Sequence, residues 1–138
     1  VFKNQGYEAT GEVVWREGSL EMFGEKLVRD RAGNVTVTGR PRVKVPSQRE
    51  IVMIEADELK ADLEHQRIDF KGNVVANRGA FRTKADAAYV LLLDQMFVME
   101  GNVEVHRGGG DLLSAQRVLI HLTSGKVMME EATGQVHY

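Results

Sequence analysis

The chain has 138 residues, which fits one domain with a substantial hydrophobic core. Its 18 basic and 20 acidic residues leave a formal net charge of −2, which disfavours a nucleic-acid partner because such proteins usually carry a basic stripe. The absence of cysteine excludes disulfides, a thiol nucleophile and cysteine metal sites, and no apolar run approaches the roughly 20 residues that span a bilayer.

The N-terminal third contains the least regular elements. The fragment Gly11-Glu12-Val13-Val14 has the form of the tail of a repeat, and a degenerate first copy runs from Leu20 through a turn at 32–34 to Gly39. Pro41 and Pro46 follow closely, and each removes a backbone donor, which would protect a local sheet edge. For Trp15, the single tryptophan, we expect packing against the core or its cap. The sequence begins at Val1 and not at methionine, so we expect a leader or anchor before it.

Three later segments share one alternating pattern. Their apolar residues recur at every second position, as Leu59, Ala61 and Leu63, then Ala88, Val90 and Leu92, then Val118, Ile120 and Leu122. A period of two predicts a strand with one buried face. Segment 56–66 also contains good helix formers, but its equivalents are rich in Val, Ile and Tyr, so we predict a strand there.

Each of these strands is followed by a polar break and a second alternating run. The breaks at 64–67, 94–95 and 123–126 predict hairpin turns, most clearly at Ser124-Gly125. The returning strands cover 68–76, 97–105 and 127–129. The sequence therefore predicts stacked antiparallel hairpins.

The returning strands carry a repeated glycine phrase. Gly72-Asn73-Val74 recurs as Gly101-Asn102-Val103 and, more weakly, as Gly134-Gln135-Val136; with Gly39 the glycine spacings are 33, 29 and 33. Repeats of this length indicate one supersecondary unit stacked on itself. Glycine inside a strand marks a bulge or bend, so every rung would bend at the same place and fold the sheet over an apolar interior. The alternative is a tight turn at each glycine.

No catalytic or metal-binding constellation is evident. The four histidines fall in different repeats without metal-ligand spacing, and neither a nucleophile elbow nor a phosphate-binding glycine loop is present. The carboxylates of Asp57, Glu58, Asp62 and Glu64 form either a solvated face or a glycosidase pair. Asp86 repeats the place of Asp57, which suggests a structural bond to a neighbouring turn. We predict a protein that is not an enzyme and that has no metal and no cofactor.

The pattern of Ala-Asp, alternation, turn and Gly-Asn-Val resembles the OstA-like family of lipopolysaccharide transport proteins. The best copy joins Ala56-Asp57 to Gly72-Asn73-Val74-Val75, and the next joins Ala85-Asp86 to Gly101-Asn102-Val103. The fourth copy departs with Ala115-Gln116, and the first departs further with Gly24-Glu25 and Gly39-Arg40-Pro41. The resemblance covers residues 11–138 and is strongest over 51–138.

The resemblance implies an all-β fold: one domain over 1–138, an antiparallel folded-over β-jellyroll of hairpin repeats of about 30 residues, open at its ends. It implies a non-enzymatic periplasmic protein that binds lipopolysaccharide through its lipid A acyl chains, as part of a bridge from the inner to the outer membrane. Its partners would be other OstA-like proteins, of the LptC and LptD type, joined through edge strands, with end-to-end homo-oligomers as a further possibility. The candidate couplers are segments 12–15 and 127–138. A segment before Val1 would decide between a free protein and one tethered to the inner membrane; within the family we favour an LptA-like protein over LptC or the LptD N-terminal domain.

Ten apolar side chains are predicted on the inner face of this trough, as lipid-binding residues: Leu63, Phe70, Val74, Val90, Leu92, Met99, Val103, Val118, Ile120 and Met129. The same residues would equally fill an ordinary dry core. Basic residues at the rung ends are either plain surface charges or contacts to lipid phosphates at the mouth; they are Arg78, Arg82, Lys84, Arg107 and Arg117.

The sequence also leaves open a different class of fold. A short parallel β-helix, acting as a carbohydrate-active enzyme or as a polymerising structural protein, would also repeat along the chain. Its rungs would be parallel, whereas hairpins require antiparallel neighbours. The direction of strand pairing therefore separates the two hypotheses.

Overall fold

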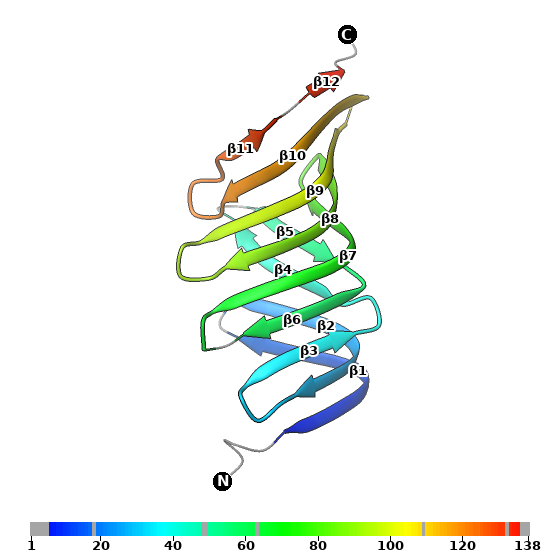
Figure 1. Ribbon diagram of the computed structural model, residues 1–138, viewed down its shortest axis with the longest axis vertical. Coiled ribbons are helices and arrows are strands. Elements are labelled where there is room, and N and C mark those ends of the chain that lie inside the picture. Colours follow the sequence, from blue (N-terminus) through cyan, green and yellow to red (C-terminus); the bar gives the residue numbers. More distant parts are fainter. Residues whose placement is uncertain are drawn as a thin grey trace.

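The computed structural model describes residues 6–17, 19–47, 50–62, 64–108, 110–131 and 133–135. Within these residues, twelve strands form one continuous sheet (Figure 1). The strands are β1 (Tyr7–Glu17), β2 (Leu20–Arg29), β3 (Asn34–Thr38), β4 (Arg42–Ser47), β5 (Glu50–Glu55), β6 (Glu58–Asp62), β7 (Arg67–Arg78), β8 (Phe81–Leu91), β9 (Met96–Arg107), β10 (Asp111–His121), β11 (Val127–Glu130) and β12 (Thr133–Gln135).

The strands pair as an antiparallel meander of long rungs. β3 and β4 lie end to end and both pair with β2, β6 and β5 form the next rung, and β11 and β12 both pair with β10. From β7 to β10 each rung is a single long strand. Since every strand pair in the described residues is antiparallel, the predicted jellyroll is confirmed and the parallel β-helix is wrong.

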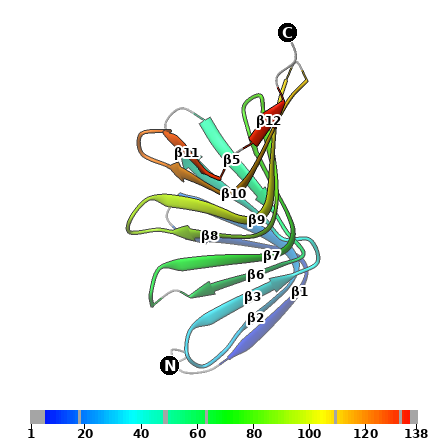
Figure 2. The ribbon, with the colours of Figure 1, turned by 45° about the horizontal axis from the view of Figure 1, so that its top comes forward.

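The rungs bend in the middle, and the sheet therefore has two arms, which diverge from a common bend in Figure 2. On β7 the register slips between Lys71 and Val74, where Gly72 and Asn73 have φ values of 82° and 47°. On β9, Gly101 and Asn102 repeat these conformations, with φ values of 81° and 47°. Two left-handed residues opposite one partner residue form a β-bulge, which bends its strand. The Gly-Asn phrase is thus a bend inside a continuous strand, as predicted, and not a tight turn.

The core lies between the two arms. Along β7, buried residues alternate with exposed or half-buried ones on each side of the bulge, so that Phe70 and Val74 both face inward. The predicted strand within 56–66 is present as β6, and the described residues 64–66 form the expected turn. Trp15 packs half-buried against the core, as expected. No helix in the described residues is long and apolar enough to cross a membrane.

Both ends of the stack are unpaired edges in the described part of the chain. β1 pairs only with β2, at the bottom of Figure 1, and β11 and β12 pair only with β10, at its top. The two predicted coupling segments lie on these edges, apart from residues 132 and 136–138, which are outside the described residues. Pro46 pairs with Ile51 of β5, beyond the three β4 residues that pair with β2, so it lies at a local edge as predicted.

Candidate functional site

The predicted inner-face residues fall into two groups. Side chains from the middle of the stack are packed in the core and are at most 1% exposed; they are Phe70, Val74, Val90, Met99 and Val103. Leu92 is half-buried at the turn after β8 and packs against this core. Leu63 lies outside the described residues. This part of the interior is a close-packed core, so an acyl chain can enter it only if the two arms move apart.

The remaining predicted residues surround an empty space near the C-terminal end of the stack. Val118, Ile120 and Met129 line a cavity of about 190 Å³. Strands β5, β7, β8, β9 and β11 contribute the rest of the wall, which consists of Val52, Ala76, Arg78, Phe81, Thr83, Val105 and Val127. An apolar cavity of about 150 Å³ already holds a small hydrocarbon such as benzene. The cavity is therefore large enough for a short segment of one alkyl chain.

Exposed apolar side chains form the rim of this cavity. Phe81, the first residue of β8, is 44% exposed, and Val127, the first residue of β11, is 42% exposed. They belong to opposite arms, since Phe81 pairs with Arg78 near the end of one arm and Val127 pairs with Ile120 at the end of the other. The apolar surface of the cavity thus continues outward to solvent.

Two polar contacts join the arms beside the cavity, where the turn after β10 lies close to the beginning of β5 (Figure 2). The hydroxyl of Ser47, which is completely buried, donates a hydrogen bond to the carbonyl of Leu122 at 3.1 Å. The guanidinium of Arg78 donates from Nη1 to the carbonyl of Gly125, also at 3.1 Å. We call these two contacts the clasp. They hold the mouth of the trough closed at this point.

Carboxylates at the bend are structural. Asp57 accepts hydrogen bonds from the Asn73 amide at 2.9 Å and from the Arg40 guanidinium at 2.8 Å. Asp86 accepts the equivalent bond from Asn102 at 2.9 Å, so its role is structural as predicted, but its partner is a bulge within the next strand and not a turn. Each of the two bonds from an asparagine fixes a bulge residue to the preceding rung.

Two further carboxylates of the acidic group, those of Glu58 and Asp62, also have partners of their own. Glu58 faces Lys60 at 3.9 Å. Asp62 contacts His65 at 2.7 Å, and this hydrogen bond lowers the pKa of the Asp62 carboxyl and raises the pKa of the His65 imidazole. Pairing of this kind favours the solvated face over a glycosidase pair. Within the described residues, no group of three or more histidine, aspartate or glutamate side chains is arranged to hold a metal.

A cation-rich ladder ties the outer face of one arm together. The Arg67 guanidinium lies 4.3 Å from the centre of the Tyr89 ring, and Arg117 donates to the Tyr89 hydroxyl at 3.0 Å. Arg117 also lies 3.5 Å from Glu100 and 3.8 Å from Glu130, so it connects β9, β10 and β11. The ladder strengthens the attachment of the last described rungs.

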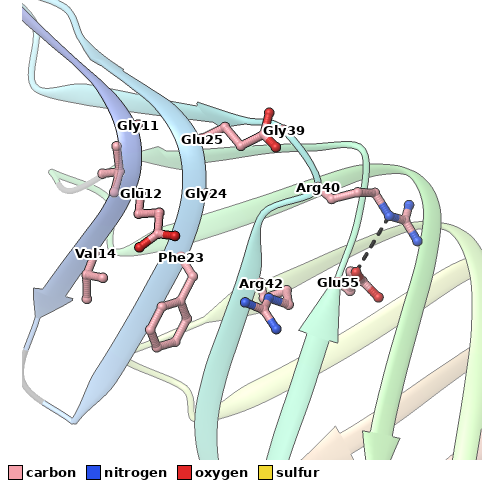
Figure 3. Close-up of a pocket in the computed structure, with 11 residues that line it drawn as sticks. Gly11, Glu12, Val14, Phe23, Gly24, Glu25, Gly39, Arg40, Arg42 and Glu55 are labelled. Atoms are coloured by element: carbon pink, nitrogen blue, oxygen red, sulfur yellow. Dashed lines mark ion pairs between the residues drawn. The ribbon is translucent and has the colours of Figure 1, made fainter.

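A larger and more polar hollow lies at the bend near β1, with a volume of about 950 Å³ (Figure 3). Its wall includes Phe23 and charged residues of both signs, and Arg40 pairs there with Glu55 at 3.6 Å. The Arg42 and Lys44 cations lie 5.7 and 5.5 Å from the Phe23 ring centre. Because five of the eleven residues that line this hollow are charged, against one of the ten around the apolar cavity, the hollow is the weaker candidate for a lipid.

Sequence reasoning missed two features of the cavity. Alternation alone gives no reason to place Ser47 against Leu122, since they are 75 residues apart in sequence. Arg78 appeared only as one of five basic residues at rung ends. The signal that could have distinguished it is its position in the alternation: Arg78 follows Val74 and Ala76 on the inward face, immediately before the Gly79-Ala80 turn. A charged residue at an inward position beside a turn is expected to lie at the mouth of the trough.

Comparisons with sequences and with solved structures give different results. No family model and no curated protein sequence matches this chain. Among solved structures, the chain is similar to LptH of Pseudomonas aeruginosa, described as the LptA homologous periplasmic component of a lipopolysaccharide transport device, with a TM-score of 0.63 at 8% sequence identity. The match covers 99% of this chain and 98% of that one. The chain therefore has the fold of an LptA-like β-jellyroll, as the resemblance implied.

Proposed function

We propose that this protein is a non-enzymatic periplasmic member of the OstA-like family that binds lipopolysaccharide and carries it between the inner and outer membranes. The observation that carries the proposal is a sheet folded over an apolar interior, whose two end strands are unpaired edges within the described residues. The whole-length structural similarity to an LptA homologue supports it. Because the similarity extends over almost the whole of that periplasmic protein, we favour an LptA-like bridge segment.

The physical requirements of a lipid carrier agree with this arrangement. Removing a methylene group from water contributes about 0.8 kcal/mol, so a trough that is continuously apolar retains an acyl chain without covalent chemistry. The ten predicted residues are the proposed contacts. Since those in the middle of the stack are tightly packed, we infer that a chain first occupies the cavity beside β11 and that the arms separate to admit the rest.

Unpaired edges supply the proposed coupling device. An exposed strand edge offers backbone N–H and C=O groups to a strand of another molecule. β1 and β11 would each accept an edge strand of a neighbouring OstA-like protein, of the LptC or LptD type, or of a second copy of this chain. Repetition of such contacts would continue the trough from one molecule to the next.

Photo-crosslinking to lipopolysaccharide tests the lipid-binding proposal. We would place a photoreactive amino acid at Ile120 or Met129, which line the cavity, because the fully buried Val90 and Met99 leave little room for one. Adducts should form at these positions and not at Lys60, which is exposed on the outer face of β6. Well-folded Ile120 and Met129 variants that yield no adducts, or as few as Lys60 does, would reject the proposed function.

A further inference from the structure

We propose that the cavity is a binding site for an anionic amphiphile, in which Arg78 contacts the anionic group while the adjoining alkyl segment fills the apolar space. This inference deepens the proposed function, on which the identity of the natural ligand rests. It assigns a specific role to one residue: Arg78 makes the site selective for a charged head group.

Placement of charge in the cavity is the first argument. Of the ten lining residues, eight are apolar, Thr83 is a buried hydroxyl, and Arg78 carries the single charge. The Arg78 side chain is only 16% exposed, so its aliphatic stem belongs to the wall and its guanidinium lies at the clasp. An arginine whose stem packs on apolar surface and whose head reaches a solvent boundary presents both halves of an amphiphile site.

The present partners of Arg78 leave capacity for a ligand. Nη1 donates to the Gly125 carbonyl, and Nε lies 3.1 Å from the Glu50 carboxylate, but the Nε–H is buried without an aligned hydrogen bond to any described residue. A guanidinium has five N–H donors in a planar fork that matches phosphate and carboxylate oxygens. Glu50 is 51% exposed, and a half-exposed ion pair is weak, so a ligand anion can displace its carboxylate into water.

The cavity volume limits what part of the ligand is enclosed. At about 190 Å³ the space exceeds the 150 Å³ that accommodates benzene, so it holds a short alkyl segment and not a whole acyl chain. Phe81 and Val127 continue the apolar surface beyond the cavity. The enclosed segment is thus the part of the chain next to the head group, and the remainder extends along the rim.

Calorimetric titration with two amphiphiles of equal chain length tests the assignment. Dodecyl phosphate is the anionic probe and hexaethylene glycol monododecyl ether is the uncharged one, each below its micelle concentration. The wild type should bind dodecyl phosphate more tightly. Arg78→Gln should weaken dodecyl phosphate binding about tenfold, the loss expected for one charge-assisted hydrogen bond, and leave the uncharged probe unchanged.

Glu50→Gln should change the affinity for dodecyl phosphate in the opposite direction. It removes the carboxylate that competes for the guanidinium, so dodecyl phosphate should bind several-fold more tightly. The matched control is Arg82→Gln, an exposed cation on the same strand as Phe81 that does not line the cavity. A purely structural role for Arg78 predicts no gain in Glu50→Gln. Equal losses in Arg78→Gln and Arg82→Gln, or weaker binding in Glu50→Gln, would overturn the assignment.

A cavity-filling variant tests the apolar half of the site. Ala76→Leu adds side-chain volume to the wall and should abolish binding of both amphiphiles, with thermal unfolding used to show that the variant folds. Unchanged binding by folded Ala76→Leu would place the ligand elsewhere.

The amphiphile site and the proposed carrier function can be rejected separately. Lipopolysaccharide adducts at Ile120 together with no effect of Arg78→Gln on dodecyl phosphate binding would reject only the amphiphile site. Selective binding of dodecyl phosphate without lipopolysaccharide adducts rejects only the carrier function.

Discussion

Asn102 donates a hydrogen bond from its side-chain amide to the carboxylate of Asp86 at 2.9 Å, across the bulge that bends β9. Asn73 and Asp57 form the same bond, at the same distance, one hairpin earlier. In both pairs the aspartate comes 16 residues before the asparagine, on the preceding rung. The repeated Ala-Asp and Gly-Asn signals are therefore two halves of one device, which fixes where β7 and β9 bend.

Gly101→Ala should destabilise the fold more than the same substitution at a left-handed glycine in open space. Its φ of +81° costs a side-chain-bearing residue about 1–2 kcal/mol, and its added Cβ would lie 2.9 Å from Asp86 Oδ2 and disturb the bond to Asn102. We expect a total loss of about 2–3 kcal/mol, measured by urea unfolding. Gly33→Ala is the control, because Gly33 has φ +90° but no atom within 4 Å of the added Cβ. Equal losses in the two variants would show that the contact with Asp86 is unimportant.

Two substitutions at Asn102 should separate its backbone role from its side-chain role. Asn102→Gly keeps the left-handed conformation accessible and removes only the hydrogen bond, so a loss of about 0.5–1 kcal/mol is expected. Asn102→Ala adds the cost of placing alanine at φ 47° and should lose about 1 kcal/mol more. Chemical denaturation of both variants measures the difference. If Asn102→Gly is as stable as the wild type, the bond to Asp86 contributes nothing to the bend.

Ser47→Ala should weaken the clasp. The substitution removes the buried hydroxyl and leaves the Leu122 carbonyl without its partner, at a cost of about 1–3 kcal/mol. Hydrogen exchange should accelerate at the amides of 121–126, because the turn after β10 would be freed from the opposite arm. Ser114→Ala, at an exposed position of β10, is the control and should change neither quantity. Unaltered exchange in 121–126 would argue against a closed mouth.

Asp62 and His65 should make a small pH-dependent contribution to stability. The His65 pKa is raised above its ordinary value of 6.5 by the bond to Asp62, so its contribution is full below pH 6.5 and is lost as the pH rises through the folded-state pKa. The Asp62 pKa is lowered from 3.8, so its contribution is present above that pH and is lost on acidification through the folded-state pKa. The pair therefore stabilises most between these two ordinary values. His65→Gln should flatten the dependence of Tm on pH above 6, and an unchanged profile would contradict the pairing.

Val14→Lys should reduce self-association through β1. Val14 is 51% exposed on an edge strand, and a lysine on an edge disfavours pairing with another strand because its charge must be desolvated. Analytical ultracentrifugation should show a lower association constant at an unchanged Tm. Asn77→Lys, which adds the same charge at an exposed position of β7 between β5 and β8, is the control. Identical association in both variants would exclude β1 as a coupling edge.

The sequence by itself determined most of the local structure. Alternation at Ala88, Val90 and Leu92 requires one buried face whatever lies above it, and Gly101-Asn102 requires a left-handed bulge, because few other residues adopt such φ values at low cost. Polar breaks such as Ser124-Gly125 set the hairpin turns. These effects depend only on residues close together in the sequence, so they can be predicted from a single repeat.

Only the tertiary structure decided how the two arms meet. Periodicity cannot say whether an inward residue packs against a neighbour or borders empty space, and Met99 and Met129 have the same pattern but opposite outcomes. Ser47 reaches Leu122, and Arg78 reaches Gly125, only because the folded sheet brings together the ends of strands that are far apart in the sequence. Contacts of this kind depend on the angle at which the arms cross, which arises from the twist accumulated over the whole sheet and is not encoded in any one rung.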